Sequence, residues 1–439
     1  MNKNIGRQFS RYVSQNIFGM IGISFYILAD TFFISRAVGA DGITALNLVL
    51  PIYSLIFAFG AMIGVGSAIR FSIASGQQDT SSDGFFTNAI FWGTIIGFVF
   101  GVAGFFFPDE IVRILGGDSG IVAVGSNYTR IFISFAPVFI WNHICNAFVR
   151  NDGNPSLAMT ATLVSSIFNV VFDYVLMFPL GMGMDGAALA TALSPLVGTA
   201  ICMIHILSKK SRVKLKRVVP SLRKLVFCCK TGVSSFVGEI SSGVITVVFN
   251  TIILHLAGNT GVAAYGVVAN ISMVAVAVFN GVSQGSQPLL SKCYGSGDAH
   301  GIRKLKTMSL MTALVLSVVI IACIYLWTEN IANIFNKEHD ALLTEYAIEG
   351  LRIYFTGFLF AGINIVGTGI FSAVDSVRWA FVTSILRGFV LIIICAFGLS
   401  AIWKMKGVWM AFPVAELLTM IVSLIGLHKI FHKDLDNIG

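Results

Sequence analysis

Apolar residues dominate this chain in long runs that polar residues interrupt only briefly. Twelve of the runs have roughly the 20 residues that an α-helix needs to cross the hydrocarbon core of a bilayer. The runs cover residues 12–36, 48–72, 86–107, 126–149, 157–180, 186–207, 232–256, 262–290, 308–327, 347–374, 378–402 and 406–428. They take up most of the 439 residues. The pattern therefore predicts an all-α integral membrane protein with twelve transmembrane helices and no sizeable soluble domain.

The distribution of charge adds an orientation to this picture. Only 11% of the residues are charged, against roughly 25% in an average soluble domain, so a water-soluble fold could not cover its surface. Lys and Arg outside the runs gather at both termini and in the even-numbered connections, most densely in 208–231. The positive-inside rule places both termini in the cytoplasm. The basic segment suits contact with anionic membrane lipids, and we predict no nucleic-acid partner.

An internal repeat relates the two halves of the chain. Segment 39–51 aligns with segment 258–270, and Asn142 aligns with Asn364, at offsets of 219 and 222 residues. Because six spans separate equivalent positions, the two lobes have the same orientation in the membrane, which makes the repeat parallel. Two such lobes can enclose a cleft that opens to either side. The predicted domains are an N-terminal six-helix lobe (1–207), a basic cytoplasmic linker (208–231) and a C-terminal six-helix lobe (232–439).

Glycines recur at four-residue spacing in the third run. Gly93, Gly97 and Gly101 lie on one face of the predicted helix, and small residues at this spacing allow helix backbones to approach closely. We interpret this ladder as a packing surface.

Acidic residues inside the runs are the candidate functional groups. Asp30, Asp173 and Glu239 each lie within a predicted span, where a carboxylate costs about 2.5–3.5 kcal/mol on insertion scales. Asn169 shares a helix face with Asp173, four residues later. These oxygens could bind a hard cation such as Na⁺, or the carboxyl groups could bind and release protons. The alternative is that each acid is paired with a neighbouring donor in a purely structural role.

Other polar residues carry less specific signals. Arg387 and Glu416 lie in the last two runs and could form a buried ion pair. The sequence has no GxxxxGK[ST], HExxH or GxSxG motif in a usable context, so we predict neither an ATPase nor another enzyme, and no cofactor.

Five motifs, in order along the chain, resemble the multidrug and toxic compound extrusion (MATE) family, and most closely its bacterial multidrug branch. They are Ala29–Phe33, Arg150–Pro155, Asn169–Asp173, Asp185–Thr191 and Gly281–Pro288. The resemblance implies two six-helix lobes around a central V-shaped cleft. It further implies export of cationic or amphiphilic compounds in exchange for H⁺ or Na⁺, through the bacterial inner (plasma) membrane. We expect the protein to act as a monomer.

The resemblance also assigns site residues. The positions that match the coupling-ion cluster of the family are Asp30, Tyr128, Asn146, Asn169, Asp173 and Thr191. If the ion is Na⁺, the expected ligands are Asp30, Asn169, Asp173 and Thr191. Glu239, Asn364 and Gln284 are candidates for a substrate site or a second cation site. Some sodium-coupled relatives have an aspartate within span ten, but Asp375 lies just past the end of that span here.

Three alternatives to an antiporter remain open. A flippase for a lipid-linked oligosaccharide or another amphiphile, in the same superfamily, would need a basic cleft. The intramembrane arginines Arg130, Arg352 and Arg387 are few beside the acids, which favours cationic substrates. A membrane enzyme acting on lipid would need a clustered catalytic set that the sequence lacks, and a channel would not require two duplicated lobes.

Overall fold

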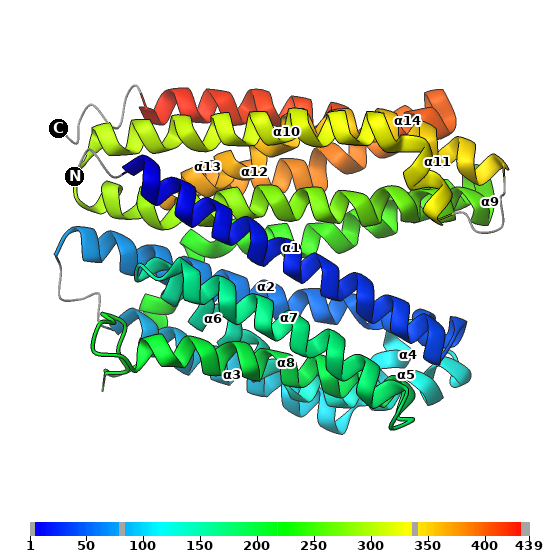
Figure 1. The fold of residues 1–439 in the computed structure, drawn as a ribbon, viewed down its shortest axis with the longest axis horizontal. Helices are drawn as coiled ribbons and strands as arrows, with labels where there is room; N and C mark the ends of the chain where they lie inside the picture. The colour runs from blue at the N-terminus through cyan, green and yellow to red at the C-terminus, as the bar shows by residue number, and fades with distance from the viewer. Residues whose placement is uncertain (1–4, 79–83, 217, 336–340, 432–439) are drawn as a thin grey trace. The chain divides into compact units, whose positions relative to one another are not determined.

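The computed structural model describes residues 5–78, 84–216, 218–335 and 341–431, and this part of the chain folds into helices without a β-strand (Figure 1). The elements in chain order are α1 (Ile5–Ala37), α2 (Ala40–Gly76), α3 (Phe85–Phe106), α4 (Pro108–Ile114), α5 (Ser119–Ser134), α6 (Ala136–Asn151), α7 (Pro155–Met177), α8 (Gly183–Ile206), α9 (Leu222–Gly295), α10 (Ala299–Phe335), α11 (Ala341–Tyr354), η2 (Phe355–Gly357), α12 (Phe358–Ala373), α13 (Val377–Ile385), η3 (Leu386–Val390) and α14 (Leu391–Lys429).

Two of the longest helices are each broken once. The backbone leaves the helical region at Gly258 in α9 (φ 63°) and at Lys404 in α14 (φ 49°). An unbroken helix of 74 residues, the length of α9, would measure about 110 Å at 1.5 Å per residue, against a hydrocarbon core of about 30 Å. Each broken segment therefore supplies two spans.

The number of spans agrees with the sequence pattern. Nine segments of the described residues are long and apolar enough to cross a bilayer, and α5 with α6, bent by 46°, form a tenth. The breaks at Gly258 and Lys404 divide two of these segments. The structure thus provides the twelve predicted spans of a multi-pass membrane protein, and this prediction is confirmed.

Contacts between the helices divide the chain into two compact units. The N-terminal unit comprises residues 18–240, and the C-terminal unit joins the described residues up to Ile17 with those from Ser241 onwards. Both unit boundaries lie inside helices, one in α1 and one in α9. The packing units thus differ slightly from lobes drawn at 1–207 and 232–439, because the first turns of α1 pack with the C-terminal helices.

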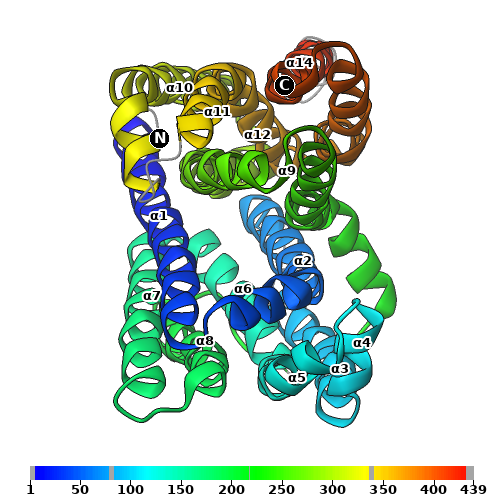
Figure 2. The same cartoon turned by 90° about the vertical axis from the view of Figure 1, so that its right-hand side faces the viewer.

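In the N-terminal unit, α6 is the helix around which the others pack. It contacts α2, α3, α7 and α8, and α7 lies along α8 (Figure 2, which looks along the helices). Aromatic rings pack together in the interior, with the Phe132 ring stacked on that of Tyr53 at a centroid distance of 4.8 Å and tilted against that of Phe139 at 4.7 Å. Offset contacts of this kind add stability beyond the area they bury.

In the C-terminal unit, α12 takes the equivalent place and packs against α10, α13 and α14. One equivalent hydrogen bond in each unit shows that the repeat extends to individual side chains. Asn142 on α6 donates from Nδ2 to the carbonyl oxygen of Pro195 on α8 at 3.1 Å. Asn364 on α12 donates from Nδ2 to the carbonyl oxygen of Glu416 on α14 at 2.8 Å. The donors and acceptors are offset as the sequence repeat requires, and the predicted repeat is confirmed at this position.

The glycine ladder of α3 packs against α6 and the end of α5. A methyl group on Gly97 would lie 2.4 Å from the Cα atom of Pro137 and 2.7 Å from its nitrogen, and one on Gly101 would lie 3.2 Å from the carbonyl oxygen of Ser134. Because the Gly97 contact is with backbone, no rotamer change could relieve it. The interpretation of the ladder as a packing surface is confirmed.

We predict that Gly97→Ala lowers the free energy of unfolding by about 1–3 kcal/mol, since an added methyl group in a packed contact forces the backbones apart. The matched control is Gly238→Ala, also inside a helix of this unit, where an added methyl group meets nothing within 4 Å. Thermal unfolding of the purified variants in detergent is the measurement. Equal unfolding temperatures for the two variants would contradict the close approach of α3 and α6.

Candidate functional site

The two predicted aspartates meet in the N-terminal unit. Asp30 lies in the last third of α1 and Asp173 in the last turns of α7, and they are 9% and 0% exposed. Their carboxyl groups are close enough to interact with each other. Ionised carboxylates only accept hydrogen bonds, so two ionised groups would repel each other and a proton or another cation between them would relieve the repulsion. We refer to Asp30 and Asp173 as the aspartate pair.

Several oxygens at this site lack a donor. With both carboxyl groups ionised, Asp30 Oδ1 and both side-chain oxygens of Asp173 are buried and have no hydrogen-bond partner among the described residues. The same holds for Asn169 Oδ1, one turn away from Asp173 on α7. Asn169 Nδ2 donates to Thr191 Oγ1 at 3.2 Å, which orients the amide. Buried oxygens without a donor are rare in folded proteins unless an ion, a water or a proton interacts with them.

Tyrosines surround the aspartate pair. Tyr128, which is 2% exposed, is close enough to both aspartates for an electrostatic interaction. The Tyr26 and Tyr53 hydroxyl oxygens lie 3.1 Å apart, and both side chains also interact with Asp30. The sequence predicts Tyr128 as part of this site, but neither Tyr26 nor Tyr53. Tyr26 precedes Asp30 by one helical turn, a spacing that could have identified it, whereas Tyr53 carries no such signal.

Glu239 connects to the same region. This carboxylate is exposed and lies in the part of α9 that belongs to the N-terminal unit. Tyr26 interacts electrostatically with Glu239 as well as with Asp30 and Asp173. An accessible acid and a buried acid pair therefore share one tyrosine neighbour.

Asn146 is held elsewhere by its hydrogen bonds. Its Nδ2 donates to the Ala158 carbonyl at 3.1 Å and to Thr162 Oγ1 at 3.0 Å. Thr162 precedes Asn169 by seven residues, which is about 10 Å along α7. The structure thus gathers Asp30, Asp173, Tyr128, Asn169 and Thr191 into one polar region and uses the amide of Asn146 two turns away.

The three residues predicted for a second site are divided between the units. Gln284 is half-buried on α9 of the C-terminal unit, and Asn364 is fully buried on α12. Glu239 lies in the N-terminal unit.

Asn364 belongs instead to a hydrogen-bonded cluster that also contains Arg387, Glu416 and Ser423. Arg387 donates to Glu416 Oε1 from Nη2 at 2.8 Å and from Nε at 3.1 Å. Asn364 Nδ2 donates to Glu416 Oε2 at 2.7 Å, and Ser423 Oγ donates to Asn364 Oδ1 at 2.8 Å. The predicted pairing of Arg387 with Glu416 is confirmed. Both oxygens of Glu416 have donors, in contrast to those of the aspartate pair.

The motif at 150–155 has a positioning role that the sequence did not reveal. Asp152, whose side chain is 1% exposed, accepts at Oδ2 from His205 Nε2 and Ser211 Oγ, both at 2.9 Å, and from the Arg212 backbone nitrogen at 3.0 Å. Arg212 Nη1 donates to Ser75 Oγ at 2.6 Å. These bonds attach the start of the basic linker to the ends of α2 and α6.

We predict that Glu416→Gln lowers the free energy of unfolding by about 3 kcal/mol, because it leaves Arg387 without its counter-charge in a largely buried place. The matched control is Glu349→Gln. Lys406 Nζ lies 3.4 Å from Glu349 Oε1, and the side chains of Lys406 and Glu349 are 69% and 27% exposed, respectively. An exposed pair contributes about 1 kcal/mol or less. Thermal unfolding in detergent compares the two variants, and a similar loss in both would contradict the structural role of Glu416.

Solved structures of low sequence identity share this fold. One, described as the outward-facing conformation of a multidrug resistance MATE family transporter of the MOP superfamily, superposes with a TM-score of 0.92 at 21% identity and covers 98% of this chain and 96% of its own. Another, a MOP superfamily transporter from Pyrococcus furiosus Vc1 (DSM3638), superposes with a TM-score of 0.90 at 20% identity and covers 99% and 96%.

Sequence relatives agree with the structural neighbours. The multidrug export protein MepA of Staphylococcus aureus (strain MRSA252) is 27% identical over 403 residues, covering 91% of this chain and 88% of the relative. MepA of Staphylococcus saprophyticus is 27% identical over 405 residues with the same coverage. The MatE family model matches residues 16–175 and 235–397, which is more than half of the chain. This protein therefore belongs to the MatE family of transporters and is not an enzyme.

Proposed function

We propose that this transporter is a secondary active antiporter that exports cationic or amphiphilic drugs and toxic compounds in exchange for H⁺ or Na⁺. The observation that carries the proposal is the aspartate pair, whose buried oxygens lack donors unless a cation or proton joins them. The naming of similar proteins as multidrug export proteins supports the substrate class. No cofactor other than the coupling ion is required.

The coupling ion would bind between the carboxyl groups of Asp30 and Asp173. Two like charges in contact within a poorly polarisable interior repel strongly, so a single proton placed between them relieves the repulsion. Na⁺ could take the same place, with Asn169 Oδ1 and the Thr191 hydroxyl oxygen as further ligands, because Na⁺ like other hard cations binds oxygen.

A cationic substrate would be attracted to Glu239, the accessible acid beside Tyr26. Its charge would stabilise the ionised form of the aspartate pair through the same region of the structure. A coupling ion bound at the pair would conversely weaken substrate binding, and linkage requires the two effects to be equal in free energy. This reciprocity is the basis of antiport.

Transport would proceed by rocker-switch alternating access. In the outward-facing state, loading of the aspartate pair would release the substrate. After return to the inward-facing state, loss of the coupling ion would restore the negative charge that favours the next substrate. We place the transporter in the bacterial inner (plasma) membrane as a monomer, with both termini in the cytoplasm, as the distribution of Lys and Arg indicates.

A flippase for a lipid-linked oligosaccharide is the alternative in the same superfamily. It would need unpaired basic residues to bind pyrophosphate. Of the three intramembrane arginines, Arg387 is paired with Glu416, while Arg130 and Arg352 are exposed. The acids around Tyr26 favour a cation over a pyrophosphate.

We predict that Asp30→Asn and Asp173→Asn each lower coupled export of ethidium by more than tenfold, because an amide can neither bind a proton nor balance the charge of Na⁺. The measurement is ethidium efflux from vesicles containing the purified protein, under a sodium gradient alone and a pH gradient alone. The gradient that sustains wild-type export identifies the coupling ion. Full export by both variants would contradict the proposal, and no export of any cationic dye by the wild type would favour the flippase.

We also predict that Glu239→Gln raises the KM for ethidium about fivefold while leaving the response to the driving gradient intact. Removal of one attractive charge at an accessible site is worth about 1 kcal/mol, which corresponds to roughly fivefold in affinity. The control is Glu349→Gln in the other unit, for which KM should not change. An unaltered KM for cationic dyes in Glu239→Gln would remove Glu239 from substrate binding.

A further inference from the structure

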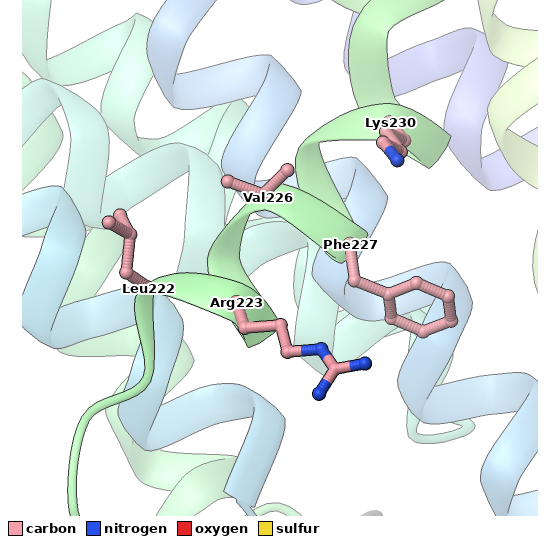
Figure 3. A pocket seen from close by; sticks show the side chains of 5 residues that line it. All are labelled: Leu222, Arg223, Val226, Phe227 and Lys230. Carbon is pink, nitrogen blue, oxygen red and sulfur yellow. The ribbon is translucent and has the colours of Figure 1, made fainter.

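A pocket of about 450 Å³ opens at the start of α9 (Figure 3). Its lining combines two basic and three apolar side chains: Leu222, Arg223, Val226, Phe227 and Lys230. This is the point at which the chain leaves the basic linker and enters a membrane-spanning helix. The pocket is remote in sequence from the aspartate pair, and transport as proposed above does not use it.

The basic groups of the pocket lie on one helix face. Arg223, Phe227 and Lys230 follow one another at spacings of four and three residues, which places their side chains along one side of α9. Figure 3 shows Arg223 and Lys230 flanking the ring of Phe227. A third cation is close, since the Arg70 guanidinium lies 3.7 Å from the centroid of the Phe227 ring.

The charges of Arg223 and Lys230 are not neutralised by an acid in the described part of the protein. Neither Arg223 nor Lys230 has an acidic partner among the described residues, and both are exposed. Arg70, by contrast, is buried, with only 8% of its surface exposed. The two exposed positive charges of Arg223 and Lys230, on either side of one ring, favour an anionic ligand.

The apolar side chains of the pocket favour a lipid over a soluble anion as the ligand. Leu222, Val226 and Phe227 are 57%, 47% and 46% exposed. A free phosphate would need only the basic groups and would leave this apolar surface in contact with water. An anionic phospholipid places its phosphate against basic side chains and its glycerol and acyl groups against apolar ones.

We infer that this pocket binds the headgroup of an anionic phospholipid from the leaflet on the side of the linker. The phosphate lies between Arg223 and Lys230. The first carbons of the acyl chains pack on Leu222 and Val226. The bound lipid fixes the start of α9 at the membrane surface, beside the linker that Asp152 attaches to the N-terminal unit.

The test is titration of the purified protein in detergent with dioleoyl phosphatidylglycerol or dioleoyl phosphatidylcholine, with bound lipid counted by native mass spectrometry. We expect preferential binding of phosphatidylglycerol. The double variant Arg223→Gln/Lys230→Gln should lower its affinity roughly 30-fold, which equals about 2 kcal/mol at 1.4 kcal/mol per tenfold change. Both side chains are exposed, so the variant should fold normally.

Two controls decide the outcome. Lys209→Gln/Lys210→Gln removes the same charge from exposed linker positions and should change the affinity by no more than about threefold, since charge effects decline with distance. The exchange Arg223→Lys/Lys230→Arg should retain binding. An equal loss in both Gln variants would show diffuse attraction and overturn the pocket. Displacement of the lipid by millimolar glycerol phosphate would overturn its identity as a lipid site.

Discussion

Two carboxyl groups in contact inside a membrane protein impose the constraint on which the rest of this structure depends. Asp30 and Asp173 come from helices far apart in sequence, and the interior that brings them together cannot solvate two negative charges. One cation or proton between them would relieve their repulsion, as we propose. A site of this kind would favour a small positive charge even in the absence of a substrate. A group that must gain and lose one such charge is what an antiporter needs to link two binding events.

The two units share a framework but differ in how completely their polar groups are paired. Asn142 and Asn364 make the same hydrogen bond to the last helix of their repeat. In the C-terminal unit, Glu416 is neutralised by Arg387 and hydrogen-bonded by Asn364, so its charge is fixed in place. In the N-terminal unit, no arginine among the described residues pairs with Asp30 or Asp173 in this way. The two similar scaffolds thus differ in their buried acids, since Glu416 is paired with an arginine and the aspartate pair has no arginine partner among the described residues.

The sequence predicted the features that hydrophobic length and intramembrane charge determine. Span-length runs identified the membrane helices, and the energetic cost of buried carboxylates identified Asp30 and Asp173. The sequence did not predict contacts that depend on how each helix is rotated about its axis. The hydroxyl pairing of Tyr53 with Tyr26 and the attachment of the linker by Asp152 link residues distant in the chain, with no spacing that signals them. The amide of Asn146 matched a family position, yet the packing of α6 on α7 directs it to Thr162.

The central claim is that the aspartate pair holds one exchangeable cation. Infrared difference spectroscopy of the purified protein in sodium-free neutral buffer tests it most directly, by the C=O stretch of a protonated carboxyl group. The account predicts that wild-type protein has such a band, that a cationic substrate or Na⁺ removes it, and that Asp30→Asn and Asp173→Asn each abolish this response. A spectrum without the band, or a response unchanged in both variants, would contradict the claim.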